Sequence, residues 1–286
     1  MLTGWVHKSV ATVIAVAVVS CAVPVTVSSA TAAPSHVQTI SVDTGFRVRR
    51  DGFSFANWSG LTKATAMSKK HMFQLLKNAG RCVDDGVNPT CTLRNGYVVD
   101  LAHLNEHLSQ GRCEGMAVLA ARIFMDRSRL VHVSTRANTT HDLTVTESAD
   151  EIAFWWATQL APNLQQWAAT HRAESVHVLA HEIFARMRNK VMLTIGLYTK
   201  DSAHAVLATK AVQRGNVTTF TVYDPNFPGE TRTLVLDHTK NSWTYKGALD
   251  RDGRTVTLSG AGAGGLDYVP ISMRSTRSQW EFLGGF

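Results

Sequence analysis

The stretch SQGRCEGMAVLAARIF, residues 109–124, decides how we interpret this chain. A turn that contains Gly111 runs into a series of good helix formers, so the pattern predicts that Cys113 lies at or next to a helix N-terminus. The unpaired N–H groups and the positive end of the helix dipole favour a thiolate over a thiol at such a position. Cys113 is therefore a candidate nucleophile whose partners must be sought elsewhere in the sequence.

The first 32 residues have the pattern of a secretory signal peptide. Lys8 precedes an apolar run, and Ala-Thr-Ala at 30–32 supplies small residues for cleavage. The run is interrupted and is shorter than the ~20 apolar residues that cross a bilayer. We expect an extracytoplasmic protein that is secreted or, as the alternative, carries a lipid anchor on Cys21. Residues 33–50 are then expected to form a flexible N-terminal segment.

The remaining cysteines are Cys82, Cys91 and Cys113. An oxidising compartment favours disulfides, and Cys82 and Cys91 bracket a polar loop with Gly and Pro that would let them pair. Cys113 is then left over. Such a thiol is a buried inert group, an intermolecular bridge or a reactive nucleophile.

Composition narrows the classes of partner. The 286 residues are 44% hydrophobic and 18% charged, an ordinary globular composition, with a formal net charge of +7. This charge suits an anionic wall, membrane surface or polymer. We find no basic stripe with interleaved aromatic residues, so we expect no nucleic-acid partner. No later segment is long and apolar enough to span a membrane, and the oligomeric state stays open.

Residues 51–286 are predicted to form a single α+β domain. Helical periodicity dominates residues 51–190, including a segment in which Ser148 and Glu151 have the spacing of a capping box. Residues 191–286 instead contain short runs of β-branched and aromatic residues separated by turns. Helices followed by strands predict a helical lobe packed on a twisted antiparallel sheet or half-barrel.

Two strand ends supply partners for the thiol. His204 opens the strand HAVLATKAV, and across one hairpin the partner strand ends in VYDPNFPG, which contains Asp224 and Asn226. A carboxylate at that end could hold one imidazole nitrogen and leave the other for sulfur. The sequence thus predicts a Cys-His-Asp site.

One segment resembles a zinc-binding motif but lacks one of the histidines that the motif requires. HEIFA at 181–185 begins like the helix of a zinc protease, but Ala185 stands where the second histidine is needed. We expect the chemistry of the Cys113 site to need no metal or organic cofactor.

At these residues the sequence resembles a family. GRCEGMAVL, AHAVLA and VYDPNFPG are similar to the three motif blocks of papain-like cysteine peptidases of the Cys-His-Asp type. DGFSFANW and EIAFWWATQL resemble blocks of a set of secreted bacterial proteins without an assigned substrate. The resemblance covers Asp51 to about Tyr245. It implies a papain-like fold, with Cys113 heading the central helix of the helical lobe as nucleophile, His204 as base and Asp224 as orienting group.

The sequence departs from that family in three places. The position six residues before Cys113, where the family has its oxyanion-hole glutamine, is His107, and the nearest glutamine is Gln110. Both are candidates for that role. Glu114 would place a like charge beside the nucleophile. Asn226 competes with Asp224 for the orienting role.

The function we expect is a secreted thiol hydrolase, a cysteine peptidase that acts on a peptide or protein through an acyl-enzyme on Cys113. One alternative is a transglutaminase-like acyltransferase or deamidase that uses the same three residues. Another is a non-catalytic cell-surface binding domain that keeps the fold, because a fold alone does not establish activity.

Overall fold

The computed structural model describes residues 38–68, 71, 82–83, 92–93, 101–250 and 252–274. The signal peptide, Cys21 and Cys91 lie outside the described residues, so the predicted export, lipid anchor and Cys82–Cys91 disulfide stay predictions. Within the described ranges, no helix combines the length and the apolar character that crossing a membrane requires.

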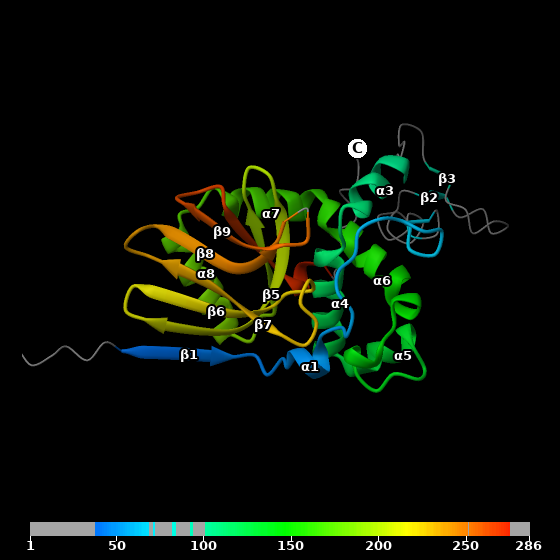
Figure 1. Cartoon of the computed structure of the whole chain (residues 1–286), viewed down its shortest axis with the longest axis horizontal. Coiled ribbons are helices and arrows are strands. Elements are labelled where there is room, and N and C mark those ends of the chain that lie inside the picture. The colour runs from blue at the N-terminus through cyan, green and yellow to red at the C-terminus, as the bar shows by residue number, and fades with distance from the viewer. Residues whose placement is uncertain are drawn as a thin grey trace, which may run out of the picture. The chain divides into compact units, whose positions relative to one another are not determined.

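The predicted order of helices before strands is confirmed: the N-terminal helices pack against a C-terminal antiparallel half-barrel sheet (Figure 1). The described helices are α1 (Val48–Asp51), α3 (Leu101–Ser109), α4 (Cys113–Met125), α5 (Leu130–Val133), α6 (Val145–Ala157), α7 (Pro162–Arg172) and α8 (Val176–Arg188). Short 3-10 turns lie at Arg127–Arg129, Thr140–Asp142, Thr158–Leu160 and Ile271–Arg274.

The sheet is built from consecutive antiparallel strands. They are β4 (Leu193–Tyr198), β5 (Ala203–Arg214), β6 (Val217–Tyr223), β7 (Thr231–Asp237), β8 (Ser242–Leu249), β9 (Thr255–Ala261) and β10 (Leu266–Pro270). Their order is β10-β4-β5-β6-β7-β8-β9. A separate two-stranded pair joins β2 (Cys82–Val83) to β3 (Thr92–Leu93). The turn-bounded strand runs of the sequence thus become one sheet in chain order, except for β10.

The expectation of a flexible segment over 33–50 does not hold from residue 39 onward. Strand β1 (Thr39–Asp43) pairs antiparallel with the second half of β5, and α1 follows it. The strand is short and its side chains are partly exposed, so its sequence carries little apolar signal. Backbone pairing with β5, which no local pattern reveals, holds it in place.

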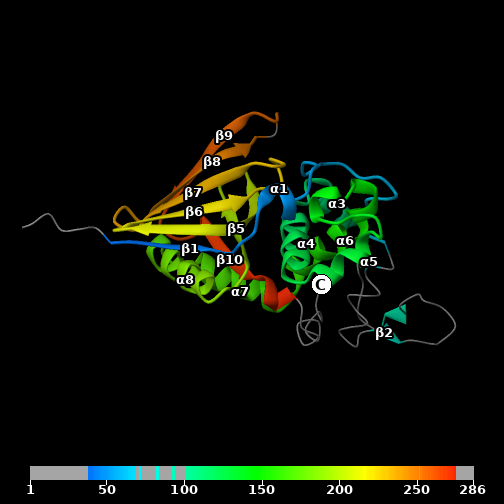
Figure 2. The same ribbon diagram turned by 90° about the horizontal axis from the view of Figure 1, so that it is seen from below.

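Two helices cover one face of the sheet, as Figure 2 shows for α7 and α8. Helix α8 contributes an apolar stripe, because Val176, Leu179, Ile183 and Met187 are all buried in the core that it shares with the strands. Trp243 from β8 lies in the same core. This face is therefore closed by helices that come directly before the sheet in the chain.

The start of one helix differs from the sequence prediction. Helix α6 starts at Val145, and its capping box is formed by Thr144 and Glu147, whereas Ser148 is buried within the first turn and donates to the Thr144 carbonyl. The same three-residue spacing occurs twice here, and the earlier pair forms the box because Thr144 has the extended backbone of an N-cap. The next helix, α7, begins with Pro162 at the N1 position, where a missing backbone N–H costs no helical hydrogen bond.

Helix α4 is the central helix of the helical region and packs between α6 and the sheet. Ten consecutive residues of this helix, from Glu114 to Ile123, are buried. It approaches α6 closely because Gly115 has no side chain: a Cβ atom there would overlap the Ile152 carbonyl oxygen and lie 2.9 Å from Cβ of Trp156. This contact fixes the helix that carries Cys113.

We expect Gly115→Ala to lower the free energy of unfolding by about 1–3 kcal/mol, because α4 and α6 must move apart. The effect should exceed the gain of about 1 kcal/mol that alanine brings to a helix. Chemical denaturation followed by circular dichroism measures the change. An unchanged or higher midpoint would show that this close approach does not constrain the helix pair.

Candidate active site

Cys113 is the first residue of α4 and is half-buried, so solvent reaches it. The preceding residue, Arg112, is the N-cap and provides no side-chain cap. Met116 donates the first backbone hydrogen bond of the helix, to the Arg112 carbonyl at 3.0 Å. The N–H groups of the first three helical residues lie before that bond, so they have no acceptor within the helix and surround the thiol with positive dipole.

His204 and Asp224 meet in a buried pair. His204 lies one residue into β5, and Asp224 directly follows β6, the next strand of the sheet. Nε2 of His204 is 2.9 Å from Oδ1 of Asp224. Because Asp224 holds Nε2, the opposite ring nitrogen, Nδ1, is left for the thiol of Cys113.

The electrostatics of His204 depend on both partners. Burial alone would lower its pKa, but the charge of Asp224, the charge of Cys113 and hydrogen bonds to both groups raise it well above the ordinary value. The imidazolium therefore persists at neutral pH and is lost only as the pH rises through the raised pKa. An imidazolium at this position stabilises a thiolate on Cys113.

Asp224 is fully buried and is held by three donors. Oδ1 accepts from His204 and from the backbone N–H of Asn226 at 2.8 Å, and the hydroxyl of Tyr245 donates to Oδ2. Burial raises the pKa of this carboxyl, but the charge of His204 and these hydrogen bonds outweigh it, so the net pKa is lowered. Asp224, rather than Asn226, is thus the residue that contacts His204.

Asn57 joins the two halves of the site and was not found from the sequence. Its side-chain oxygen accepts from the Arg112 N–H at 2.7 Å, and its side-chain nitrogen donates to Oδ1 of Asn226 at 3.0 Å. Its own N–H donates to the Pro225 carbonyl at 2.8 Å. One side chain therefore connects the residue before Cys113 to the turn that follows Asp224.

The side chain of Arg112 also binds the loop that carries Asn57. It is fully buried, and its guanidinium donates to the carbonyls of Trp58 and Gly60 at 2.8 and 2.7 Å. Burial lowers its pKa to about 10. The segment that carries Asn57 is thereby tied to the start of α4 by both the backbone and the side chain of one residue.

Glu114 points into the protein, where it forms a buried ion pair with Arg274. Oε1 also accepts from the Thr194 hydroxyl at 3.1 Å. A neighbouring cation thus compensates the like charge that the sequence placed beside the nucleophile.

Gln110 and His107, the two candidates for the role of the oxyanion-hole glutamine, lie on the surface. Gln110 is exposed, and its backbone N–H donates to the His107 carbonyl at 3.1 Å. The ring of His107 is exposed and lies against His103, with 3.1 Å between their Nε2 atoms. The structure brings Cys113, His204 and Asp224 together and places His107 with its helix neighbour. The backbone N–H groups at the start of α4 are further hydrogen-bond donors beside Cys113.

Comparison of the chain with protein-family models, curated proteins and solved structures found no match. The resemblance to papain-like cysteine peptidases therefore rests on the motif residues and stays a prediction.

We expect His204→Ala to slow alkylation of Cys113 by iodoacetamide about tenfold or more at pH 6. One pKa unit of a thiol changes its thiolate fraction tenfold below that pKa, and the variant lacks the imidazolium beside Sγ. The rate at Cys113 is measured by peptide mapping between pH 5 and 9. The difference should be largest at acidic pH, where His204 is protonated, and should shrink as the pH rises. His132→Ala, at an exposed histidine, is the control, and equal rates at pH 6 would contradict the pairing.

We also expect Asn57→Ala to slow this alkylation several-fold, because Arg112 and Asn226 lose their common partner. The loss of these hydrogen bonds should lower the free energy of unfolding by about 1–3 kcal/mol. Alkylation is therefore compared at a temperature where circular dichroism shows both proteins folded. The exposed Asn138→Ala serves as control. If Cys113 in Asn57→Ala reacted as fast as in the unchanged protein, the hydrogen bonds of Asn57 would not position the thiol.

Proposed function

We propose that the protein is a thiol hydrolase of the papain-like type, a cysteine peptidase that acts outside the cytoplasm. The observation that carries the proposal is the alignment of a buried carboxylate, an imidazole with a raised pKa and a half-buried thiol at a helix N-terminus. Inert structural thiols do not need this arrangement, whereas nucleophilic catalysis does.

The reaction follows from the positions of these groups. The thiolate of Cys113 attacks an amide carbonyl carbon, and the N–H groups at the start of α4 stabilise the oxyanion. The C–N bond then breaks while His204 donates its proton to the leaving amine. Water gives a proton back to His204 as it attacks the thioester, and the acid leaves with Cys113 restored.

The remaining groups support this assignment over a non-catalytic domain. Asp224 and Tyr245 keep His204 oriented from the buried side, which leaves its other nitrogen for sulfur. The ion pair with Arg274 compensates the negative charge of Glu114, so this charge opposes a thiolate on Cys113 less strongly. Export rests on the signal-peptide pattern of residues 1–32.

We expect the protein to form one acyl-enzyme per chain with a p-nitrophenyl ester of an N-blocked amino acid. Intact mass and peptide mapping locate the acyl group, and the release of nitrophenol gives the rate. Because general acid–base catalysis contributes roughly 10²–10⁴-fold, His204→Ala should lower turnover by at least about a hundredfold. Cys113→Ala should abolish acylation at this site.

Adding a primary amine to the same assay identifies the acceptor. A hydrolase releases mainly the acid, whereas a transglutaminase-like enzyme transfers the acyl group to the amine. Acylation of Cys113 at equal rates with and without His204, and without turnover, would favour the non-catalytic binding domain instead.

A further inference from the structure

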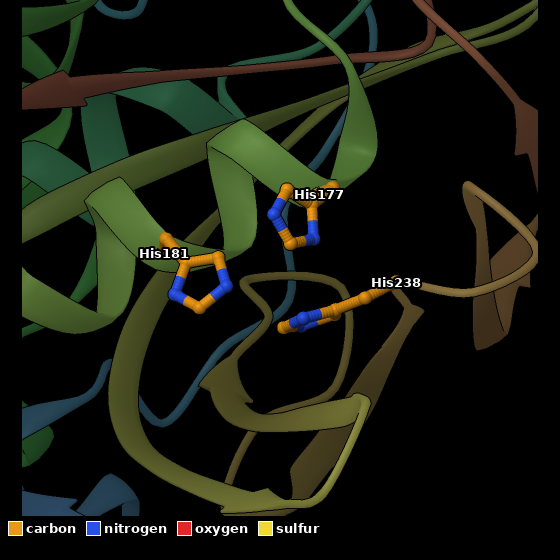
Figure 3. A group of neighbouring side chains, drawn as sticks. All are labelled: His177, His181 and His238. Carbon is orange, nitrogen blue, oxygen red and sulfur yellow. The ribbon is translucent and has the colours of Figure 1, made fainter. Parts of the chain in front are cut away.

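Three histidines gather on the side of the sheet that α8 covers. His177 and His181 lie four residues apart on α8, so both rings project from one face of the helix. His238 follows β7, in the turn that leads into β8. The ring centroids are separated by 4.6 Å within the helix pair and by 5.3 and 5.0 Å to His238. Figure 3 shows the three rings turned toward one common space.

We propose that His177, His181 and His238 form a binding site for a divalent transition-metal ion of the zinc type. One ring nitrogen from each residue lies within 4.8 Å of the others. A tetrahedral zinc ion with Zn–N bonds of about 2.0–2.1 Å needs its ligand nitrogens about 3.3 Å apart. The exposed rings on α8 can close this gap by rotating.

The chemistry of the ligands selects the metal. Neutral imidazole nitrogens suit zinc, copper and nickel, whereas magnesium and calcium require oxygen ligands. With three protein ligands, a fourth position stays open to water or to a partner group.

The site also has the outer contacts that orient a metal ligand. The Thr218 hydroxyl lies 2.9 Å from Nε2 of His238, which leaves Nδ1 for the ion. The backbone N–H of His238 donates to the Asn216 carbonyl at 2.8 Å. In the same turn, Oδ1 of Asn241 accepts from the N–H of Val176, the first residue of α8, at 2.9 Å. The turn and the helix start are therefore held together before any ion binds.

This site is separate from the candidate active site. Thr218 lies near the start of β6 and Asp224 follows its end, so the two sites are about 20 Å apart along the strand at roughly 3.3 Å per residue. An ion at the histidines would join α8 to the β7–β8 turn without contacting Cys113. We infer that it stabilises the packing of α8 on the sheet.

The test uses untagged protein that carries Cys113→Ser, because a thiolate beside His204 could itself bind zinc. We expect calorimetric titration with Zn²⁺ to give one ion per chain. A hundredfold excess over Kd should raise the unfolding midpoint by about 5–10 °C, whereas Mg²⁺ and Ca²⁺ should leave it unchanged. Co²⁺ in the site should show the visible absorption of a tetrahedral complex.

Two variants and one control decide the outcome. His238→Ala and His181→Ala should each weaken zinc binding at least about tenfold, and His181 is exposed, so its loss should not disturb folding. His107→Ala is the matched control, because it breaks the other histidine pair with four-residue spacing, on α3. Absence of stoichiometric zinc binding would overturn the proposal, as would unchanged affinity in His238→Ala or an equal loss in His107→Ala.

Discussion

The buried carboxylate of Asp224 is the constraint on which the site depends. A carboxylate that is fully shielded from water is costly unless charge and hydrogen bonds compensate it. Here the compensation comes from His204 on β5, Tyr245 on β8 and the backbone of Asn226. Strands that are not neighbours in the sheet must therefore keep their register for this one group to stay ionised, and the orientation of His204 follows from it.

The helical region meets this constraint through Asn57. Its amide binds the N–H of Arg112 on one side and Asn226 on the other. Arg112 in turn holds the loop around Asn57 by its buried guanidinium. The thiol and the imidazole thus come from different parts of the fold, but the distance between them is set by a short chain of hydrogen bonds rather than by packing alone.

The sequence predicted the parts of the molecule that have a local cause. The strands from β4 to β9 follow from β-branched runs between turns, and α8 follows from its apolar stripe. Cys113, His204 and Asp224 could be selected because each lies at the end of an element. The sequence could not show β1, Asn57 or Tyr245, because their roles arise from pairing with residues more than twenty positions away. Thr144 was missed for a different reason, since Ser148 offers the same local cap spacing and only the backbone geometry separates them.

The histidine cluster is a second example of a site that the sequence could not predict, because its residues are far apart in the chain. The zinc-protease pattern requires a histidine four residues after His181, where the chain has Ala185, whereas His177 lies four residues before His181. Two histidines four residues apart on one helix supply two ligands, but this spacing is common by chance. The pair alone therefore does not predict a metal site. The third ring, His238, is 57 positions from His181 in sequence and reaches it only because the β7–β8 turn meets the start of α8. The β7–β8 turn thus supplies both the Asn241 side chain that binds the start of α8 and the third histidine. This turn lies beside the start of β6, whereas the turn that carries Asp224 follows the end of β6.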